Sequence, residues 1–144
     1  PMIWHSKVIP TLDAMNAMSA NTLVAHLDIQ IVDVGDDYIT GTMPVDARTH
    51  QPYGILHGGA SVVLAESLGS LGAALCVDLE RYRVVGLDIT SNHIRGVRSG
   101  RVSATAPPVH IGRQTQVWSI RQVDENDKLT TITRLTMAVL ENPS

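Results

Sequence analysis

A single glutamate in an otherwise apolar stretch is the strongest chemical signal in this 144-residue chain. Between His57 and Asp78 the only ionisable side chains are Glu66 and Cys76. The stretch has helical spacing and should be buried, and a buried carboxylate without a partner is energetically costly. We therefore expect Glu66 to be hydrogen-bonded, to be kept neutral, or to be used in catalysis. The alternative is a helix that surfaces for one turn and exposes Glu66 to water.

Residues near Glu66 in the sequence could complete a catalytic site. Ser70 follows one helical turn later and could bond the carboxylate or a ligand, or could be a small residue that permits close packing. His57-Gly58-Gly59 opens the helix, where free backbone N–H groups form a natural site for an oxyanion. His57 could orient a substrate or cap the helix, and Gln51 in the preceding loop adds a neutral donor. Oxyanion donors and a carboxylate are the two parts that an acyl-transfer site needs.

Two other clusters carry weaker signals. Asn92–Arg95 closes one expected strand, and His110–Gln114 forms a turn into another. Both could cradle phosphates, although solvated strand ends are the commoner interpretation of such residues. No HxxxH, HxH or HExxH spacing is present, so we expect no metal. A nucleophilic serine is disfavoured because no G-x-S-x-G elbow occurs.

Hydrophobic periodicity indicates the elements that must position these groups. The only long helix is expected over residues 58–77, and a short one over 11–18. Strands are expected over residues 29–34, 38–45, 83–93, 101–106, 114–123 and 129–140. In the last, alternate residues from Leu129 to Val139 share one face. Strands without repeated helical crossovers cannot form a parallel sheet, so we expect an α+β fold with an antiparallel sheet curled around one helix.

The long helix is apolar nearly all round and should be covered on most sides. Its Gly69, Gly72 and Ala73 would let another backbone approach closely. One sheet of this size would still leave a helix flank and its own strand edges uncovered, and strand edges need pairing or cover. We therefore expect a homo-oligomer.

Composition narrows the function classes for what we expect to be a single domain, residues 1–144. A formal net charge of −3 and 3% aromatic residues do not suit a nucleic-acid partner held by charge or stacking. One cysteine, Cys76, excludes an internal disulfide and a Cys-rich zinc site. No uncharged apolar run indicates a membrane span, and the first residues lack signal-peptide features. We expect a cytoplasmic protein without a membrane partner.

Three segments closely resemble the hotdog-fold acyl-CoA thioesterases of the PaaI-like group: residues 43–46, 48–61 and 64–70. The most specific block is Q-P-x-G-x-x-H-G-G-x-x-x-x-L-A-E, which runs from Gln51 to Glu66. Within that group the chain is most similar to bacterial 1,4-dihydroxy-2-naphthoyl-CoA thioesterases and to the proofreading thioesterases of enterobactin synthesis. The resemblance covers almost the whole chain.

The resemblance implies that Glu66 is the catalytic carboxylate and that the backbone N–H of Gly58 polarises the thioester carbonyl. Glu66 would come from one subunit together with Ser70, which would place the attacking water. Gly58 would come from the neighbouring subunit together with Gln51 and His57, which would assist it. Active sites would lie at a dimer interface, with dimers paired into tetramers and no metal or other cofactor. Coenzyme A would lie along Val85, Gly86, His93, Ile94, Arg95, Gly96, His110, Ile111, Gly112, Arg113, Gln114 and Thr115.

The expected activity is hydrolysis of an aryl- or β-hydroxyaryl-type acyl-CoA such as 1,4-dihydroxy-2-naphthoyl-CoA, with Glu66 as general base or nucleophile. Three alternatives stay open: proofreading of aryl- or acyl-carrier-protein thioesters, a hotdog hydratase or dehydratase, and a non-catalytic acyl-CoA binder. Two departures from the family pattern suggest an altered acyl pocket. Tyr53 replaces the usual Phe, and Thr90-Ser91 stand where relatives commonly have Asn-Ala.

Overall fold

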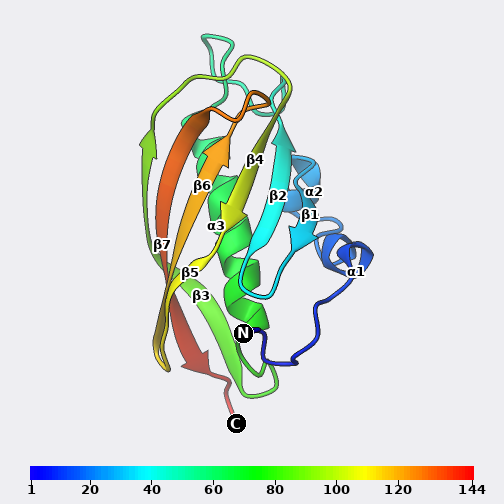
Figure 1. The fold of residues 1–144 in the computed structure, drawn as a ribbon, viewed down its shortest axis with the longest axis vertical. Helices are drawn as coiled ribbons and strands as arrows, with labels where there is room; N and C mark the ends of the chain where they lie inside the picture. Colours follow the sequence, from blue (N-terminus) through cyan, green and yellow to red (C-terminus); the bar gives the residue numbers. More distant parts are fainter.

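The computed structural model describes residues 1–144 and contains one antiparallel sheet of seven strands. The strand order is β1-β2-β4-β6-β7-β3, and β5 pairs with β6 beside this path. The strands are β1 (Gln30–Val34), β2 (Ile39–Pro44), β3 (Tyr82–His93), β4 (Arg101–Ala106), β5 (Pro108–Ile111), β6 (Thr115–Val123) and β7 (Leu129–Glu141). The helices are α1 (Leu12–Ala17), α2 (Leu23–His26) and α3 (Gly58–Leu75). The expected sheet around one long helix is confirmed (Figure 1).

One face of α3 is buried against the inner surface of the sheet, where it contacts β2, β3, β4, β6 and β7. The expected cover on most sides is confirmed, and so is the expected uncovered flank, because Glu66 and Ser70 on one side of the helix are only half-buried. The close approach at the helix glycines is made by side chains and not by another backbone. A Cβ atom would lie 2.5 Å from Leu135 at Gly69 and 2.8 Å from the Trp118 ring at Gly72.

Buried polar side chains of β6 fix the position of α3 along the sheet. Gln122 donates from Nε2 to the carbonyl of Ser61 at 2.7 Å, near the start of the helix. Gln116 donates to the carbonyl of Ala73 at 3.4 Å, near its end. Both glutamines are fully buried, so these bonds form in a low-dielectric environment where misalignment is costly. These two bonds therefore fix the position of α3 relative to β6.

Two short elements depart from the sequence expectations. The four-residue helix α2 lies in a segment with no expected element, and it has no side-chain cap. His110 and Ile111 belong to β5, which pairs with β6, and not to a turn as expected. The turn proper begins at Gly112, whose N–H donates to the carbonyl of Thr115 at 2.9 Å. The alternating inward face of the last strand is confirmed by its burial pattern.

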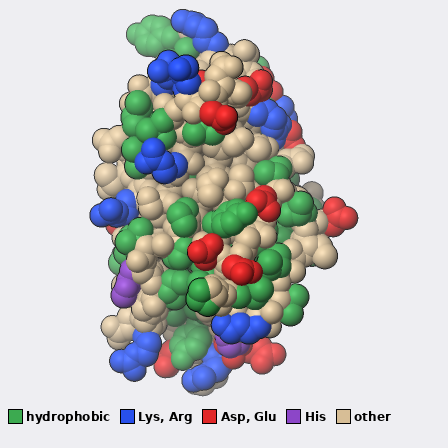
Figure 2. All heavy atoms as spheres, viewed as in Figure 1, with side chains coloured by type: hydrophobic (Ala, Val, Ile, Leu, Met, Phe, Trp, Pro, Cys, Tyr) green, Lys and Arg blue, Asp and Glu red, His purple; other side chains and the backbone are tan.

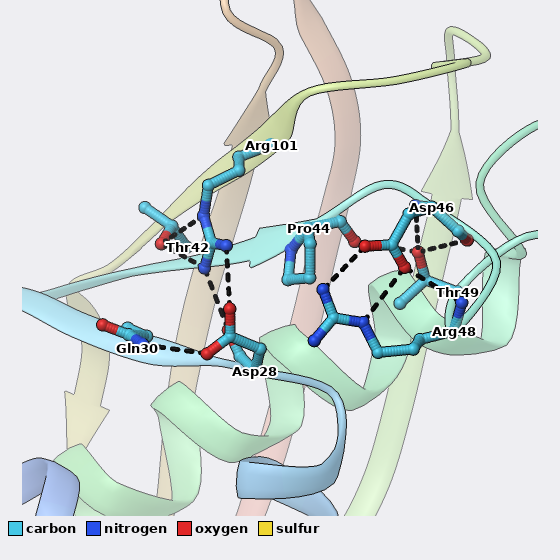
Figure 3. A network of polar contacts seen from close by, with 8 residues as sticks. All are labelled: Asp28, Gln30, Thr42, Pro44, Asp46, Arg48, Thr49 and Arg101. Atoms are coloured by element: carbon cyan, nitrogen blue, oxygen red, sulfur yellow. Dashed lines mark hydrogen bonds and ion pairs between the residues drawn. The ribbon is translucent and has the colours of Figure 1, made fainter.

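A polar network ties the start of β1 to the neighbouring strands (Figure 3). Arg101 of β4 pairs with Asp28 at 3.1 Å and also donates to the Asp28 carbonyl and to Thr42 of β2. Gln30 donates to the second Asp28 oxygen at 2.8 Å. The Asp28 backbone has φ of 53°, so this side-chain network stabilises a left-handed turn between α2 and β1.

The surface carries interspersed charges of both signs. On the face in Figure 2, acidic side chains lie among apolar ones across the lower half, and Lys and Arg side chains are spread from end to end. By length and composition α3 could cross a membrane, but it is the helix on which the sheet packs, with 39% of its residues buried.

Candidate active site

Glu66 lies on the open flank of α3 and faces a cavity of about 490 Å³. The cavity lies between α3, the α1–α2 segment and strands β1 and β3. The Glu66 carboxylate makes no hydrogen bond or ion pair within the chain, since the two ion pairs of the molecule are Asp46–Arg48 and Asp28–Arg101. No Lys, Arg or His side chain lines the cavity. Glu66 is half-buried, and because its carboxylate has no partner it can accept a proton or attack a carbonyl carbon.

Gly86 of β3 provides the space that the Glu66 carboxylate occupies. A Cβ atom on Gly86 would lie 2.4 Å from Glu66 Oε2, far inside van der Waals contact. The register of β3 against β7 shifts between Gly86 and Asp88, as at a β-bulge. Sequence reasoning placed Gly86 only along coenzyme A, whereas the structure sets it directly against the candidate catalytic carboxylate.

Ser70 lines the same cavity as Glu66, one turn further along α3. Its hydroxyl lies 3.8 Å from the sulfur of Met137 and does not bond the Glu66 carboxylate. The expected shared face is confirmed. The Ser70 hydroxyl has only this weak partner, so it can readily exchange it for a water molecule in the cavity.

The start of α3 presents one free backbone donor. His57 caps the helix by accepting the N–H of Gly59 at Nδ1, 2.7 Å away. The N–H groups of Ala60 and Ser61 both donate to the carbonyl of His57. Only the N–H of Gly58 lacks a partner in this first turn, where the helix dipole favours negative charge. Gly58 is thus the group best suited to an oxyanion.

The His57 and Gln51 side chains are oriented by the bonds they already make. Because Nδ1 of His57 accepts a hydrogen bond, the ring carries its proton on Nε2, which can act as a donor. The Oε1 atom of Gln51 accepts the N–H of Tyr53, which leaves the Gln51 amide nitrogen as a free donor. Both side chains therefore offer neutral donors, as a site for a developing oxyanion requires.

The donors and the carboxylate lie in different cavities of one chain. Gln51 and Gly58 line a cavity of about 320 Å³ that shares no residue with the Glu66 cavity. Gly58 and Glu66 are eight residues apart on α3, or about 12 Å along the helix axis at 1.5 Å per residue. A single thioester carbonyl cannot contact both groups at hydrogen-bond distance.

The segments expected along coenzyme A are spread over the length of the molecule. β3 ends near the upper end of the molecule in Figure 1. His93, Ile94, Arg95 and Gly96, at and just after this end of β3, line the Gly58 cavity. His93 lies against Gly58, where a Cβ atom would be 3.0 Å from His93 Nε2. Val85 and Gly86 lie midway along β3. The turn between β5 and β6 lies near the lower end of the molecule in Figure 1. A separate cavity of about 370 Å³ at this turn is lined by His110, Gly112, Arg113, Gln114 and Thr115.

No three His, Cys, Asp or Glu side chains converge as metal ligands would. The lone cysteine has little nucleophilic character, because burial raises the pKa of the Cys76 thiol to about 11. The chemistry available near α3 is therefore that of one carboxylate, backbone and side-chain N–H donors, and hydroxyls.

Comparison with known proteins decides the family. A family model described as the thioesterase superfamily matches residues 53–131, which include Gly58, Glu66 and β3. The chain belongs to the thioesterase superfamily. It has the hotdog fold, and thioester hydrolysis is its activity.

Named relatives of this thioesterase cover nearly its whole length. The 1,4-dihydroxy-2-naphthoyl-CoA hydrolase of Escherichia coli is 51% identical over 96% of this chain and 100% of its own. The proofreading thioesterase EntH of Cronobacter turicensis is 47% identical over 96% of this chain and 99% of its own. A crystal structure of a mutant thioesterase from Pseudomonas aeruginosa matches with a TM-score of 0.94 at 49% identity. The match covers 97% of this chain and 99% of the chain in that structure.

Proposed function

We propose that this thioesterase hydrolyses acyl-CoA thioesters of aryl or β-hydroxyaryl type, such as 1,4-dihydroxy-2-naphthoyl-CoA, at an active site shared between two subunits. The observation that carries the shared site is the separation of Gly58 from Glu66 within one chain. The substrate class is supported by the named relatives and by the apolar cavity around Glu66. We place the protein in the cytoplasm, where acyl-CoA thioesters are formed.

Each residue has a role in the proposed reaction. The partner's Gly58 N–H, with Gln51 and His57, would bind the thioester oxygen and stabilise the charge that develops on it. As a general base, Glu66 would take a proton from a water held by Ser70, while the water oxygen attacks the carbonyl carbon. As a nucleophile, Glu66 would itself attack and form a mixed anhydride that water then cleaves. In both routes the C–S bond breaks and the thiolate of coenzyme A leaves and takes up a proton.

The exposed edge of β3 supports the proposed dimer. β3 lies at the end of the strand order and pairs only with β7, so its other edge is open along 12 residues. Val85 and Leu87 on this strand are 43% and 64% exposed. Antiparallel pairing of two β3 strands would bring the partner's His93 end, and the Gly58 against it, toward the half of β3 that contains Gly86. We further propose that two such dimers form a tetramer.

Coenzyme A would then contact both chains, with its phosphates near Arg95 or Arg113. Both arginines lie at strand ends beside glycines, where a phosphate can approach the backbone closely. The open Gly58 cavity gives one such entrance and the cavity at Gly112 the other. These are the segments expected from the family resemblance, and their assignment rests on that resemblance together with this charge.

A substrate panel tests the proposed function. Thiol release would be followed for benzoyl-CoA, a hydroxynaphthoyl-CoA, acetyl-CoA and palmitoyl-CoA, and for benzoyl groups loaded on an acyl carrier protein. We expect kcat/KM for the aryl-CoA substrates to exceed that for the aliphatic ones at least about tenfold, as pocket contacts allow. Hydration of crotonyl-CoA without thiol release would indicate hydratase chemistry, and a preference for palmitoyl-CoA would contradict the aryl assignment.

A further inference from the structure

The wall of the Glu66 cavity opposite α3 is formed by the segment that contains α1 and α2. Met18, Ser19, Thr22 and Val24 from this segment line the cavity, with Ile29 and Ile31 at the start of the sheet. Figure 1 shows α1 and α2 beside β1 at the sheet edge. These residues have no role in the proposed mechanism.

The lining of this cavity has a definite chemical character. Of its 12 residues seven are hydrophobic, and Glu66 is the only charged one. A ligand group that carries its own carboxylate would meet Glu66 with no cation to offset the repulsion and the loss of hydration. A neutral apolar group would instead displace water from apolar side chains. The hydroxyls of Ser19 and Ser67 make no side-chain hydrogen bond within the chain, so they can bond hydroxyl groups on such a ligand.

Met18 is an unusual surface residue in this wall. It is 65% exposed although it is apolar, and it stands at the C-cap of α1 at the mouth of the cavity. Methionine is unbranched and adapts to flat or irregular apolar surfaces. An acyl group seated beside Glu66 would cover Met18, and the length of this side chain would then limit the width of the group.

The wall is attached to the sheet at both ends, so its position is defined. At one end the Asn16 amide pairs with the backbone of Ile31: Nδ2 donates to the carbonyl at 3.0 Å, and Oδ1 accepts the N–H at 2.8 Å. At the other end Asp28 is held by Arg101 of β4 (Figure 3). A side chain between two fixed points can discriminate between ligands by size.

We infer that the α1–α2 segment is the acyl-selecting wall of the active site. Met18 limits the width of the acyl group, and the absence of a cation excludes acyl groups that carry a carboxylate. Asn16 acts as a positioning residue for this wall. The inference rests on the proposed function, because it requires the acyl group to lie beside Glu66 during thioester hydrolysis.

Variants of Met18 test the width limit. The measured quantity is the ratio of kcat/KM for a hydroxynaphthoyl-CoA to kcat/KM for benzoyl-CoA. Met18→Trp should lower this ratio at least about tenfold, because the added volume meets the second ring, while benzoyl-CoA turnover persists. Leu23→Ala is the matched control: Leu23 is an apolar residue of the same segment, 56% exposed, and does not line the cavity. Its ratio should stay within twofold of the wild-type value.

Two further variants test charge and positioning. Met18→Lys should raise kcat/KM for 4-carboxybenzoyl-CoA relative to benzoyl-CoA by at least about tenfold, since it supplies the missing cation. Asn16→Ala should move the naphthoyl-to-benzoyl ratio toward one, a change that a loss of stability alone would not produce. If the ratios of the Met18 variants equal those of the wild type while benzoyl-CoA is turned over, the inference is wrong and the proposed function stands. Absence of thiol release by the wild-type enzyme would overturn both.

Discussion

At the scale of single residues, the catalytic proposal depends on Glu66. Its carboxylate has no partner within the chain and faces an apolar cavity. Replacing Glu66 with Ala should lower kcat by about two to four orders of magnitude, as for the loss of a positioned base or nucleophile. Glu66→Gln should be similarly impaired, because an amide can neither accept the proton nor form an anhydride. Steady-state thiol release from benzoyl-CoA, with thermal melting to show that the variants fold, checks this. A near-normal rate for Glu66→Ala would exclude Glu66 from the chemistry.

The donors and hydroxyls near α3 should suffice without a metal. No cluster of three ligand side chains converges in the fold, and each proposed step uses a carboxylate, an N–H or a hydroxyl. We therefore expect activity to be unchanged after incubation with EDTA and gel filtration. Thiol release before and after treatment is the measurement. Loss of turnover that zinc or magnesium restores would show that His57, His93 or His110 binds a metal that the reaction needs.

At the scale of elements, the β3 bulge is expected to determine where the carboxylate lies. Gly86→Ala would place a methyl group 2.4 Å from the present position of Glu66 Oε2. Because the Glu66 side chain is flexible, it should move aside, so kcat should fall by about tenfold or more with little change in melting temperature. Steady-state kinetics and thermal melting measure the two effects. If the melting temperature of Gly86→Ala falls so far that unfolding accounts for the loss of activity, Gly86 serves only the packing of the strand.

The Asp28–Arg101 network should contribute to stability in a pH-dependent way. The Gln30 amide that donates to Asp28, together with Arg101, holds the pKa of that carboxyl below its ordinary value of 3.8. A lowered folded-state pKa stabilises the fold above pH 3.8, and this contribution is lost as the pH falls through the folded-state value. Asp28→Asn should therefore lower the free energy of unfolding by about 1 kcal/mol at pH 7, and the difference should shrink below about pH 4.

Urea unfolding of both proteins from pH 7 to pH 3 measures this difference. Asp46→Asn is the matched control, because the Asp46–Arg48 pair is more exposed to solvent and should contribute less. Arg48 lowers the pKa of the Asp46 carboxyl to about 2, but the two residues are close in sequence and the pair is exposed, so solvent screening should leave this pair the smaller contribution. A constant difference between the wild type and Asp28→Asn at all pH values would show that ionisation of Asp28 does not stabilise the turn.

The elements that sequence analysis predicted well are long and strongly periodic. α3 and β7 bury regular faces, so their pattern of apolar residues is legible in the sequence. α2 has four residues and no side-chain cap, and β5 begins at the second of two consecutive prolines, a pair that is typical of a loop. The contact between Gly86 and Glu66 depends on a bulge in β3, which no local pattern reveals. Asn16 was missed for a related reason, since its partner Ile31 is recognisable only once α1 is placed against β1.

At the scale of the whole molecule, one chain contains two incomplete halves of an active site. The Gly58 donors and the Glu66 carboxylate are about 12 Å apart along α3, and in the proposed dimer a second copy would bring the missing half to each. Sequence analysis could name these residues, because their types and the family motif are local. Their division between two cavities could be seen only after the helix was placed in the sheet. Light scattering should accordingly give a mass well above the 15.5 kDa of one chain.

Complementation between two inactive variants tests the shared site most directly. One variant carries Glu66→Ala, and the other carries Gln51→Ala with His57→Ala. After complete subunit exchange about half of the dimers are heterodimers, and each contains one intact site and one doubly damaged site. Activity should therefore recover to roughly a quarter of the wild-type value per chain if the sites act independently. No recovery, in a mixture where mass spectrometry detects heterodimers, would mean that each site lies within a single subunit.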